Sequence, residues 1–538
     1  MLVGLLYQDQ DWNQQSKQYF DWETIREDLG LKTLFDMASK EIQWSGKTVK
    51  RIEEADTTIM KNMEKVMMVP LKDAEEILYR QEVIRDFEKN EELIFDLYRF
   101  ARQVLSEWQG LGRGIVVKTS GFHSSGDLVN QIHVIQLFLD SLGILKRKLS
   151  KYKGKLSSRA LCSFIERLEE EFSDEYEAGL REIMKDVDFY IKDAGDEGKR
   201  KNSAKTRMKL VLSYDEGMKF TGWKLADLGT DKVRSFGSAN PIGMVQSFVN
   251  SKIPYSVCVE PDSALHEDAM QLEYQVVKYV LTAMNPFLLN FRYFFDQLLL
   301  QTSFYKGAIL LNKHMKRLGI SGCFPTPGER FDFTFSQLKE YVMALEQLVN
   351  PVGNDCRIRN KNMLIVTGAN QGGKSTFLRS VGIAQVMMQC GLKVAATQYS
   401  SGVYPTLFTH FTRREDSEMN SGRLDEELDR MSQIVDQLRE GSMVLLNESF
   451  ATTTEKDGSR IAYDILTAFQ EKKIMVLTVT HLLGFARKMY ENEERRQQTE
   501  FLSAERLEDG SRTFRMVQGE PSLQSFGLDL YEKYIKIE

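Results

Sequence analysis

The stretch Met363-Leu364-Ile365-Val366-Thr367-Gly368-Ala369-Asn370-Gln371-Gly372-Gly373-Lys374-Ser375 decides the fold of this chain. A short apolar run leads into a glycine-rich turn, which matches GxxxxGK[ST] over residues 368–375 and opens a helical pattern from Thr376 to Cys390. Glycines here let backbone N–H groups converge on phosphate, and the N-terminus of the following helix adds a favourable dipole. The pattern therefore predicts a phosphate-binding loop between a buried strand and a helix.

Two side chains of this loop have distinct expected roles. Lys374 neutralises the β- and γ-phosphates of a nucleotide, and Ser375 ligates Mg²⁺ through its hydroxyl. ATP and Mg²⁺ are therefore the expected cofactors. The expected nucleotide-binding residues are Gly368, Asn370, Gly372, Gly373, Lys374, Ser375 and Thr376, together with Ser421 and Gly422 discussed below.

A second apolar strand pattern, 443–446, ends in Asn447-Glu448. Glu448 is positioned to orient or activate the attacking water and is predicted to be catalytic. Asn447 occupies the place where an aspartate usually supports Mg²⁺. An amide keeps one oxygen acceptor but lacks the charge, so Ser375 and Asn447 are the predicted metal ligands and metal support should be weakened.

His481 and the pair Ser421-Gly422 can each be interpreted in two ways, as part of the nucleotide site or as purely structural residues. His481 follows the strand pattern 475–480 and is predicted to hydrogen-bond the γ-phosphate or its water, although a histidine alone is more often structural. Ser421 and Gly422 precede a helical pattern at 425–438, where they form either a small anion site or only a helix cap. The sequence leaves these alternatives open.

Strands that alternate with helices after residue 350 predict a parallel sheet covered by helices, an α/β domain over 350–538. Residues 61–349 are expected to form an all-α lever and core region with long arms. Helical patterns over 157–192, 264–284, 286–318 and 335–349 support this expectation. Residues 1–60 are weakly periodic, and no role is predicted for them.

Composition narrows the class of protein. The 538 residues predict three or four domains at roughly 150 residues each. A content of 42% hydrophobic and 28% charged residues excludes a disordered chain. The scattered cysteines, the absence of a basic leader and the lack of a bilayer-length apolar run indicate a cytoplasmic protein without a membrane partner.

The net charge of −6 does not indicate a nucleic-acid binder, yet a local basic groove can still contact phosphate on an acidic protein. One basic cluster follows a loop signal at 194–198, and it is either a DNA contact or a solvated loop. Its members are Lys199, Arg200, Lys201, Lys205, Arg207 and Lys209.

Together these motifs resemble the MutS family of DNA mismatch-repair ATPases, which are relatives of ABC-type ATPases. The resemblance covers about 60–538 and is strongest over 350–538. Besides the loop, it is carried by Ser421-Gly422-Arg423, Asn447-Glu448, Asp457-Gly458, Thr480-His481, Met516-Val517-Gln518-Gly519, Gln524-Ser525-Phe526-Gly527-Leu528 and the segment Pro70–Val83.

The resemblance implies a homodimer with composite ATP sites, in which Ser421 of each chain reaches the nucleotide held by Lys374 of the other. It also implies long helices that act as levers of a DNA clamp, with the basic cluster near the tips that touch DNA. The DNA expected is a duplex with a distortion, a mismatch or a branch.

Three departures from the family pattern qualify this expectation. The roughly 60 residues before the helical core leave no room for an N-terminal mismatch-reading domain, and no nuclease-like extension follows the ATPase region. Asn447 replaces the expected aspartate, and residues 449–452 replace a glycine-bearing turn. The leading hypothesis is a DNA-binding ATPase in mismatch repair or recombination. The alternative is a nucleotide-gated dimeric scaffold with weak hydrolysis and no direct DNA recognition.

Overall fold

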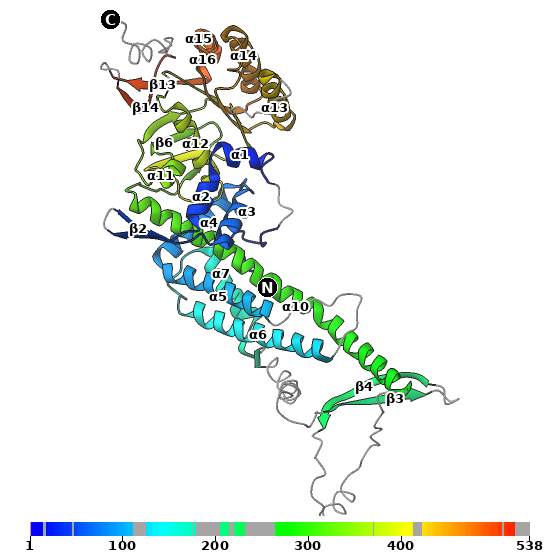
Figure 1. Ribbon diagram of the computed structural model, residues 1–538. Helices are drawn as coiled ribbons and strands as arrows, with labels where there is room; N and C mark the ends of the chain where they lie inside the picture. The colour runs from blue at the N-terminus through cyan, green and yellow to red at the C-terminus, as the bar shows by residue number, and fades with distance from the viewer. Residues whose placement is uncertain are drawn as a thin grey trace, which may run out of the picture. The chain divides into compact units, whose positions relative to one another are not determined.

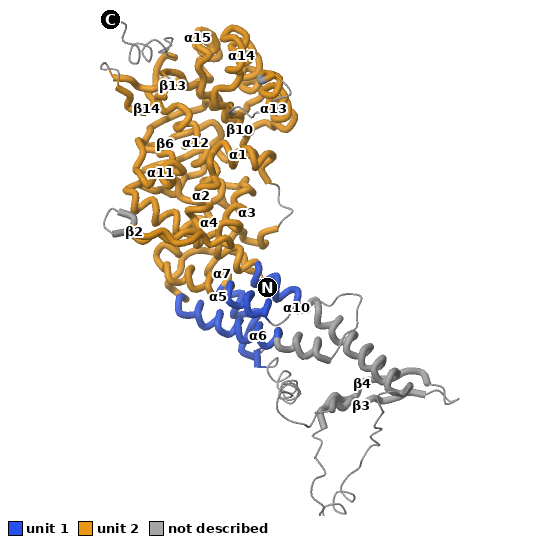
Figure 2. The backbone as a smooth tube through the Cα atoms, in the orientation of Figure 1, with its two compact units in different colours: residues 1, 102–152, 165–296 blue, residues 2–101, 153–164, 297–538 orange. Residues whose placement is uncertain are grey.

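The computed structural model describes residues 2–13, 18–45, 48–110, 125–175, 177–178, 205–214, 220–231, 264–369, 371–412, 422–507 and 511–521. The chain forms two compact units, which Figure 2 shows in different colours. The first comprises residues 102–152 and 165–296 with Met1, and the second comprises residues 2–101, 153–164 and 297–538. Both helices and strands occur along the described chain, so the fold is mixed α/β.

The second unit contains a six-stranded sheet, of which Figure 1 labels the strands β13 and β14. Its order is β10-β11-β12-β8-β13-β14, with parallel neighbours except for the antiparallel pair β13–β14. The three predicted strands are confirmed, since they lie in adjacent positions as β11, β12 and β8. The strands are β8 (Met363–Thr367), β10 (Leu407–Phe411), β11 (Met443–Asn447), β12 (Met475–Val479), β13 (Thr499–Arg506) and β14 (Arg512–Gln518).

Alternate residues of the parallel strands face different helices, because successive side chains of a strand point to opposite faces. Val444, Leu446 and Val476 belong to a core cluster shared with α13 (Arg423–Gln437), α14 (Glu455–Glu471) and α15 (Leu483–Glu491). The other face meets α12 (Lys374–Met388), where a side chain at Gly382 would come within 2.7 Å of Leu445. The sheet is thus covered on both faces, as expected for a parallel sheet.

A second, four-stranded sheet has the order β5-β9-β6-β7. Its strands are β5 (Thr326–Gly328), β6 (Phe333–Leu338), β7 (Asn354–Ile358) and β9 (Gln398–Gly402). The predicted helix over 335–349 is therefore wrong in its first part, and α11 spans only Tyr341–Gln347. Buried Phe333 and Phe335 alternate with partly exposed neighbours, which is a strand period, and Glu340 accepts the N–H of Met343 to start the helix. This sheet takes strands from both sides of residue 349, which is the predicted end of the lever and core region.

The N-terminal segment packs into the second unit through buried polar contacts. Gln301 accepts hydrogen bonds from the backbone N–H groups of Leu5 and Leu6 at 2.7 and 3.1 Å, and it donates to Asp11 at 2.7 Å. Arg80 donates to the Leu6 carbonyl at 3.0 Å. The segment continues into α1 (Trp22–Asp28), α2 (Leu31–Ala38), the hairpin β1 (Ile42–Ser45) and β2 (Thr48–Ile52), and α3 (Thr57–Met67).

The long helices differ from prediction in two places. The pattern 157–192 forms α7 (Arg159–Glu171), which ends where the Phe172 carbonyl accepts a hydrogen bond from Lys146 at 3.1 Å; residues 179–192 lie outside the described residues. The two patterns 264–284 and 286–318 form one helix, α10 (Ala264–Arg317), which continues through Pro286 although a proline inside a helix removes one backbone hydrogen bond. None of the described helices has the length and hydropathy that crossing a membrane requires.

The region 61–349 is not all-helical. Lys205, Arg207 and Lys209 of the basic cluster lie on β3 (Lys205–Tyr214), which forms an antiparallel hairpin with β4 (Phe220–Asp231) in the first unit. Within this strand Arg207-Met208-Lys209-Leu210 alternates polar and apolar residues, a period-2 signal that the charge pattern concealed. The remaining helices are α4 (Ala74–Lys89), α5 (Glu91–Gly110), α6 (Ser125–Ser150) and α16 (Glu493–Gln497).

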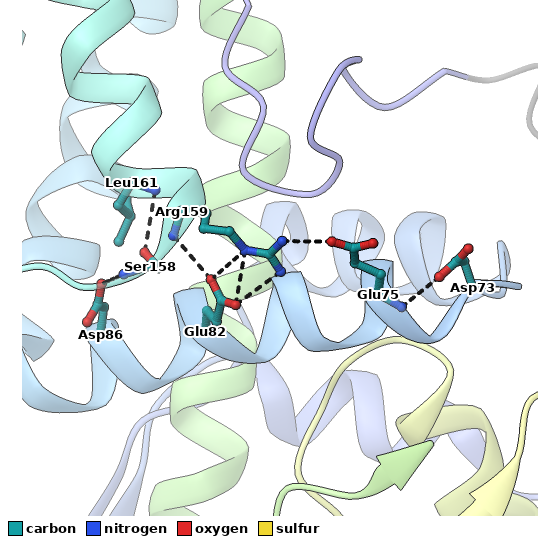
Figure 3. Close-up of polar contacts among 7 residues, drawn as sticks. All are labelled: Asp73, Glu75, Glu82, Asp86, Ser158, Arg159 and Leu161. Atoms are coloured by element: carbon teal, nitrogen blue, oxygen red, sulfur yellow. Dashed lines mark hydrogen bonds and ion pairs between the residues drawn. The ribbon is translucent and has the colours of Figure 1, made fainter. Parts of the chain in front are cut away.

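The start of α7 is joined to α4 by polar contacts (Figure 3). Asp86 of α4 is buried and accepts the backbone N–H groups of Ser157 and Ser158 at 2.8 and 2.7 Å. Arg159 forms ion pairs with Glu82 and Glu75 at 3.1 and 2.9 Å (Figure 3). Burial acts to raise the pKa of Asp86, but hydrogen bonds from the two serines outweigh it and hold that pKa below its ordinary value.

We expect Asp86→Asn to lower the free energy of unfolding by about 1.5–3 kcal/mol at neutral pH, because charge-assisted hydrogen bonds to buried N–H groups are lost. A carboxyl whose folded-state pKa is lowered stabilises the chain above its ordinary pKa of about 3.9 and loses this effect as the pH falls through the folded value. The difference between Asp86→Asn and the unmodified chain should therefore narrow between pH 7 and pH 3 in urea titrations. Glu82→Gln, at a more exposed ion pair, should cost less than about 1 kcal/mol. Equal effects of the two substitutions would contradict this reading.

Candidate functional site

The glycine-rich loop runs from the end of β8 to the start of α12 and lies against β13. Gly368 has a φ of 114°, and a side chain there would meet the backbone nitrogen of Ala504 at 2.9 Å. A side chain at Gly372 would meet the Cβ of Ala504, also at 2.9 Å. Gly373, with a φ of 89°, is the residue before the first turn of α12. Only glycine satisfies both the backbone conformation and the close approach at Gly368.

Lys374 is buried at the first position of α12, and its ammonium group bonds to the loop itself. The Nζ atom donates to the carbonyl oxygens of Gly368 and Ala369 at 2.9 and 3.0 Å. Burial lowers the pKa of Lys374; the Glu448 carboxylate opposes this shift and the Arg512 guanidinium adds to it. Among the described residues the hydrogen bonds of this buried cation go to neutral carbonyl oxygens, so Lys374 is well placed to attract an anion.

Ser375 and Asn447 are brought together as the sequence predicts. The Ser375 hydroxyl donates to the Asn447 amide oxygen at 2.8 Å across the gap between α12 and the end of β11. Both are neutral oxygen donors, which suits Mg²⁺ in ligand type, but Asn447 contributes no charge. Glu448 follows Asn447, is partly exposed, and donates its backbone N–H to the Val479 carbonyl at 2.8 Å.

A cavity of about 390 Å³ opens over the loop. Its polar lining includes Lys374, Ser375, Thr376 and Glu448, together with Glu340, Asn354 and Gln371. Its apolar lining comes from segments that sequence reasoning did not include: Leu338, Met343, Pro351, Val352 and Phe514. A cavity lined by both charged and apolar groups suits a molecule that has both charged and apolar parts.

Two residues of β14 complete the site without any sequence signal. Arg512 donates to the Gln371 side chain at 2.8 Å, and the ring of Phe514 lies 3.5 Å from the position that a Gly373 side chain would take. Asn354 of β7 fixes this strand by accepting the Met516 N–H at 2.7 Å. Neither contact follows a recognisable motif, because each depends on pairing between segments about 140–160 residues apart in sequence.

The other predicted site residues are placed less directly. Gly422 is exposed immediately before α13, whereas Asn370 and Ser421 lie outside the described residues. His481 is exposed after β12 and is not among the described residues that line the cavity. Of the basic residues, Lys205 and Arg207 lie on β3, and Lys199, Arg200 and Lys201 lie outside the described residues.

Comparison with known proteins agrees with this architecture. The family model for MutS domain V matches residues 364–535, which contain the loop and the six-stranded sheet. The family model for the MutS2 N-terminal domain matches residues 72–194. These two matches define the class, a protein with a MutS-type C-terminal domain and a MutS2-type helical region.

Three relatives show the same likeness. The chain is 31% identical over 134 residues to mouse (Mus musculus) "MutS protein homolog 4", covering 25% of this chain and 14% of that protein. It is 32% identical over 143 residues to "Endonuclease MutS2" of Lacticaseibacillus casei, covering 26% of this chain and 18% of that protein. It is 29% identical over 163 residues to "Endonuclease MutS2" of Aquifex aeolicus, covering 30% of this chain and 21% of that protein. The chain therefore belongs to the MutS family, although it matches less than a quarter of the length of these relatives.

We expect Gly368→Ala to destabilise the chain by about 1–2 kcal/mol, because an alanine at this φ is strained and its Cβ meets the backbone of Ala504. Gly422→Ala is the matched control, since its φ is −69° and nothing lies within 4 Å of the added Cβ. Thermal unfolding followed by circular dichroism should show a lower midpoint only for Gly368→Ala. A similar loss in both variants would show that the contact with Ala504 is not the cause.

Proposed function

We propose that the chain is a MutS-like DNA-binding ATPase, in which ATP binding and hydrolysis drive a dimeric clamp on DNA in mismatch repair or recombination. The observation that carries this proposal is that Lys374, Ser375 and Glu448 line one cavity, with Asn447 hydrogen-bonded to Ser375. Residues 350–538 then form an ABC-type P-loop ATPase domain, 61–349 the core and lever region, and 1–60 an N-terminal segment. Membership in the MutS family supports the assignment to DNA metabolism.

In this proposal the triphosphate of ATP takes the place of the loop carbonyls around Lys374. The ammonium group of Lys374 neutralises the β- and γ-phosphates, and the backbone N–H groups at the start of α12 hold their oxygens. The base lies against the apolar lining that includes Val352 and Phe514. Gly368, Asn370, Gly372, Gly373 and Thr376 belong to the same nucleotide loop.

Ser375 and Asn447 would hold Mg²⁺ through their oxygens, and the ion would offset phosphate charge during hydrolysis. Glu448 lines the cavity and acts as the group that orients or activates the attacking water. His481 is the proposed contact to the γ-phosphate or its water. Because Asn447 is uncharged, metal support is weaker than a carboxylate provides, and turnover should be slow.

Two chains would form composite sites, with Ser421 and Gly422 of one chain completing the nucleotide site of the other. The exposed position of Gly422 before α13 suits such a contact, since the N-terminus of a helix favours an anion. DNA would be contacted through Lys199, Arg200, Lys201, Lys205 and Arg207.

We expect Glu448→Gln to retain ATP binding and to reduce the rate of hydrolysis by at least about 100-fold, because the amide cannot accept a proton from water. Binding is measured with a fluorescent ATP analogue and hydrolysis by phosphate release. Glu440→Gln serves as the control, since Glu440 is exposed near the start of the same strand and lies away from the cavity. Unchanged hydrolysis in Glu448→Gln would remove Glu448 from the catalytic site.

A second candidate function is favoured by Asn447. Without a carboxylate at this position, nucleotide binding could control dimer formation while hydrolysis stays weak. The chain would then be a nucleotide-gated dimeric scaffold for protein partners, with no direct DNA recognition. Binding to DNA separates the two candidates.

We expect binding to a four-way junction or mismatched duplex to exceed binding to plain duplex and to change when ATP and Mg²⁺ are added. Fluorescence anisotropy at fixed salt measures this, because phosphate contacts make every affinity salt-dependent. Replacing Lys205 and Arg207 by glutamine should weaken all three affinities and reduce the salt slope by about 1 for each phosphate contact. Lys473→Gln, at an exposed lysine in the second unit, is the control. No binding at low salt would favour the scaffold.

A further inference from the structure

The turn that carries Glu448 has a strained backbone. Glu448 has a φ of 56° and Phe450 a φ of 63°, and both are residues other than glycine in the left-handed region. Each such residue costs on the order of 1 kcal/mol or more and persists only where its surroundings hold it. The turn lies at the cavity, so what holds it also determines where the Glu448 carboxylate points.

Hydrogen bonds from two neighbouring strands hold the main chain of this turn. The Glu448 N–H donates to the Val479 carbonyl at 2.8 Å, and the Thr412 hydroxyl donates to the Glu448 carbonyl at 2.9 Å. These contacts hold only the end of the turn at which Glu448 lies. The other end, Ser449 and Phe450, depends on a separate set of contacts.

His410 provides that second set. It lies on β10 and is fully buried, and its Nδ1 atom is 2.7 Å from the Ser449 hydroxyl, which also lies 2.9 Å from the His410 carbonyl oxygen. Its ring stacks on Phe450 with the centroids 5.9 Å apart. Burying an imidazole costs free energy unless both of its nitrogens form hydrogen bonds. One nitrogen is bonded to the residue next to Glu448.

The second nitrogen of His410 connects to α13. Nε2 lies 3.1 Å from the backbone carbonyl oxygen of Glu427, and since a carbonyl only accepts, Nε2 carries the proton. The side chain of Glu427 makes a parallel connection, because the Thr452 hydroxyl donates to its Oε2 at 2.9 Å. The imidazole therefore bridges the Glu448 turn and the helix that begins directly after Ser421-Gly422.

We propose that His410 is a positioning residue for ATP hydrolysis: by joining Ser449 to the Glu427 carbonyl, it holds Glu448 in its left-handed conformation and fixes this turn to the helix that follows Ser421-Gly422. The inference rests on the proposed ATPase function. It assigns a role to Ser449, one of the residues that depart from the family pattern. Removing the bridge leaves Lys374 and its loop intact, so hydrolysis should fall while nucleotide affinity stays.

The test compares kcat for ATP hydrolysis with the Kd for a fluorescent ATP analogue. His410→Phe keeps the ring on Phe450 and removes both hydrogen bonds of the imidazole. Ser449→Ala removes the hydroxyl contacts to Nδ1 and to the His410 carbonyl oxygen but leaves the Nε2 bond to Glu427, and Ser449→Thr keeps the hydroxyl. We expect kcat to fall at least about tenfold in the first two variants and to recover in Ser449→Thr, with every Kd within about threefold of the unmodified chain. The double variant should be no slower than the slower single variant, because the two residues act through one contact.

Ser442→Ala is the matched control. Ser442 is a buried serine at the opposite end of β11, where its hydroxyl oxygen accepts the Arg439 N–H at 3.2 Å. This substitution removes a comparable buried hydrogen bond far from the Glu448 turn, so it should lower the thermal midpoint without changing kcat. Should His410→Phe fail to fold, Ser449→Ala decides the question.

Each outcome has one meaning. A selective loss of kcat in His410→Phe and Ser449→Ala supports the bridge. The bridge is contradicted if kcat in both variants stays within twofold of the unmodified chain. It is also contradicted if Ser442→Ala loses kcat as well and the loss in all three variants is in proportion to the fall in thermal midpoint. Either result leaves the ATPase function intact. An unmodified chain that binds ATP without hydrolysing it overturns both the ATPase function and this inference, and that failure is recognised before any variant is made.

Discussion

Burial of α12 on every side is the constraint on which the rest of the second unit depends. Twelve of its fifteen residues are buried, including the polar Lys374, Ser380 and Gln385. Such a helix cannot fold against a sheet alone, because its outward face must also be covered. The N-terminal segment supplies part of this cover, since Leu29 lies within 2.7 Å of the position that a side chain at Gly382 would take.

The same helix connects the nucleotide loop to distant parts of the chain. Lys374 begins it, and just beyond its end Gln389 donates to the carbonyl oxygens of Leu71 and Tyr404 at 3.0 and 2.8 Å. Arg80 lies within 3.4 Å of the Cys390 carbonyl and also holds the N-terminal segment. The loop is therefore supported by a rigid element that is anchored at both ends, which is what precise placement of a phosphate requires.

The chemistry of the site combines retained and altered parts. The loop has the glycines and the lysine of a phosphate site, while the proposed metal position pairs two neutral oxygens, those of Ser375 and Asn447. A buried histidine–serine contact holds the turn after Glu448, in which two residues have positive φ. In the proposed ATPase, tight binding of nucleotide is compatible with slow turnover, because the loop is assigned to binding and Glu448 to hydrolysis.

The sequence by itself determined the glycine-rich loop, the three central strands and the pairing of Ser375 with Asn447, because these follow from local periodicity and from motifs whose residues meet at the carboxyl edge of one parallel sheet. It did not reveal the β6 strand, the β3–β4 hairpin or the continuity of α10, since short or charged patterns are compatible with more than one element. Only the tertiary structure decided that Phe514 and Arg512 border the loop, that residues 2–13 and 18–38 pack onto the second unit, and that His410 meets Ser449. Those contacts join segments 39 or more residues apart, and pairing between strands and helices, which no local pattern records, brings them together.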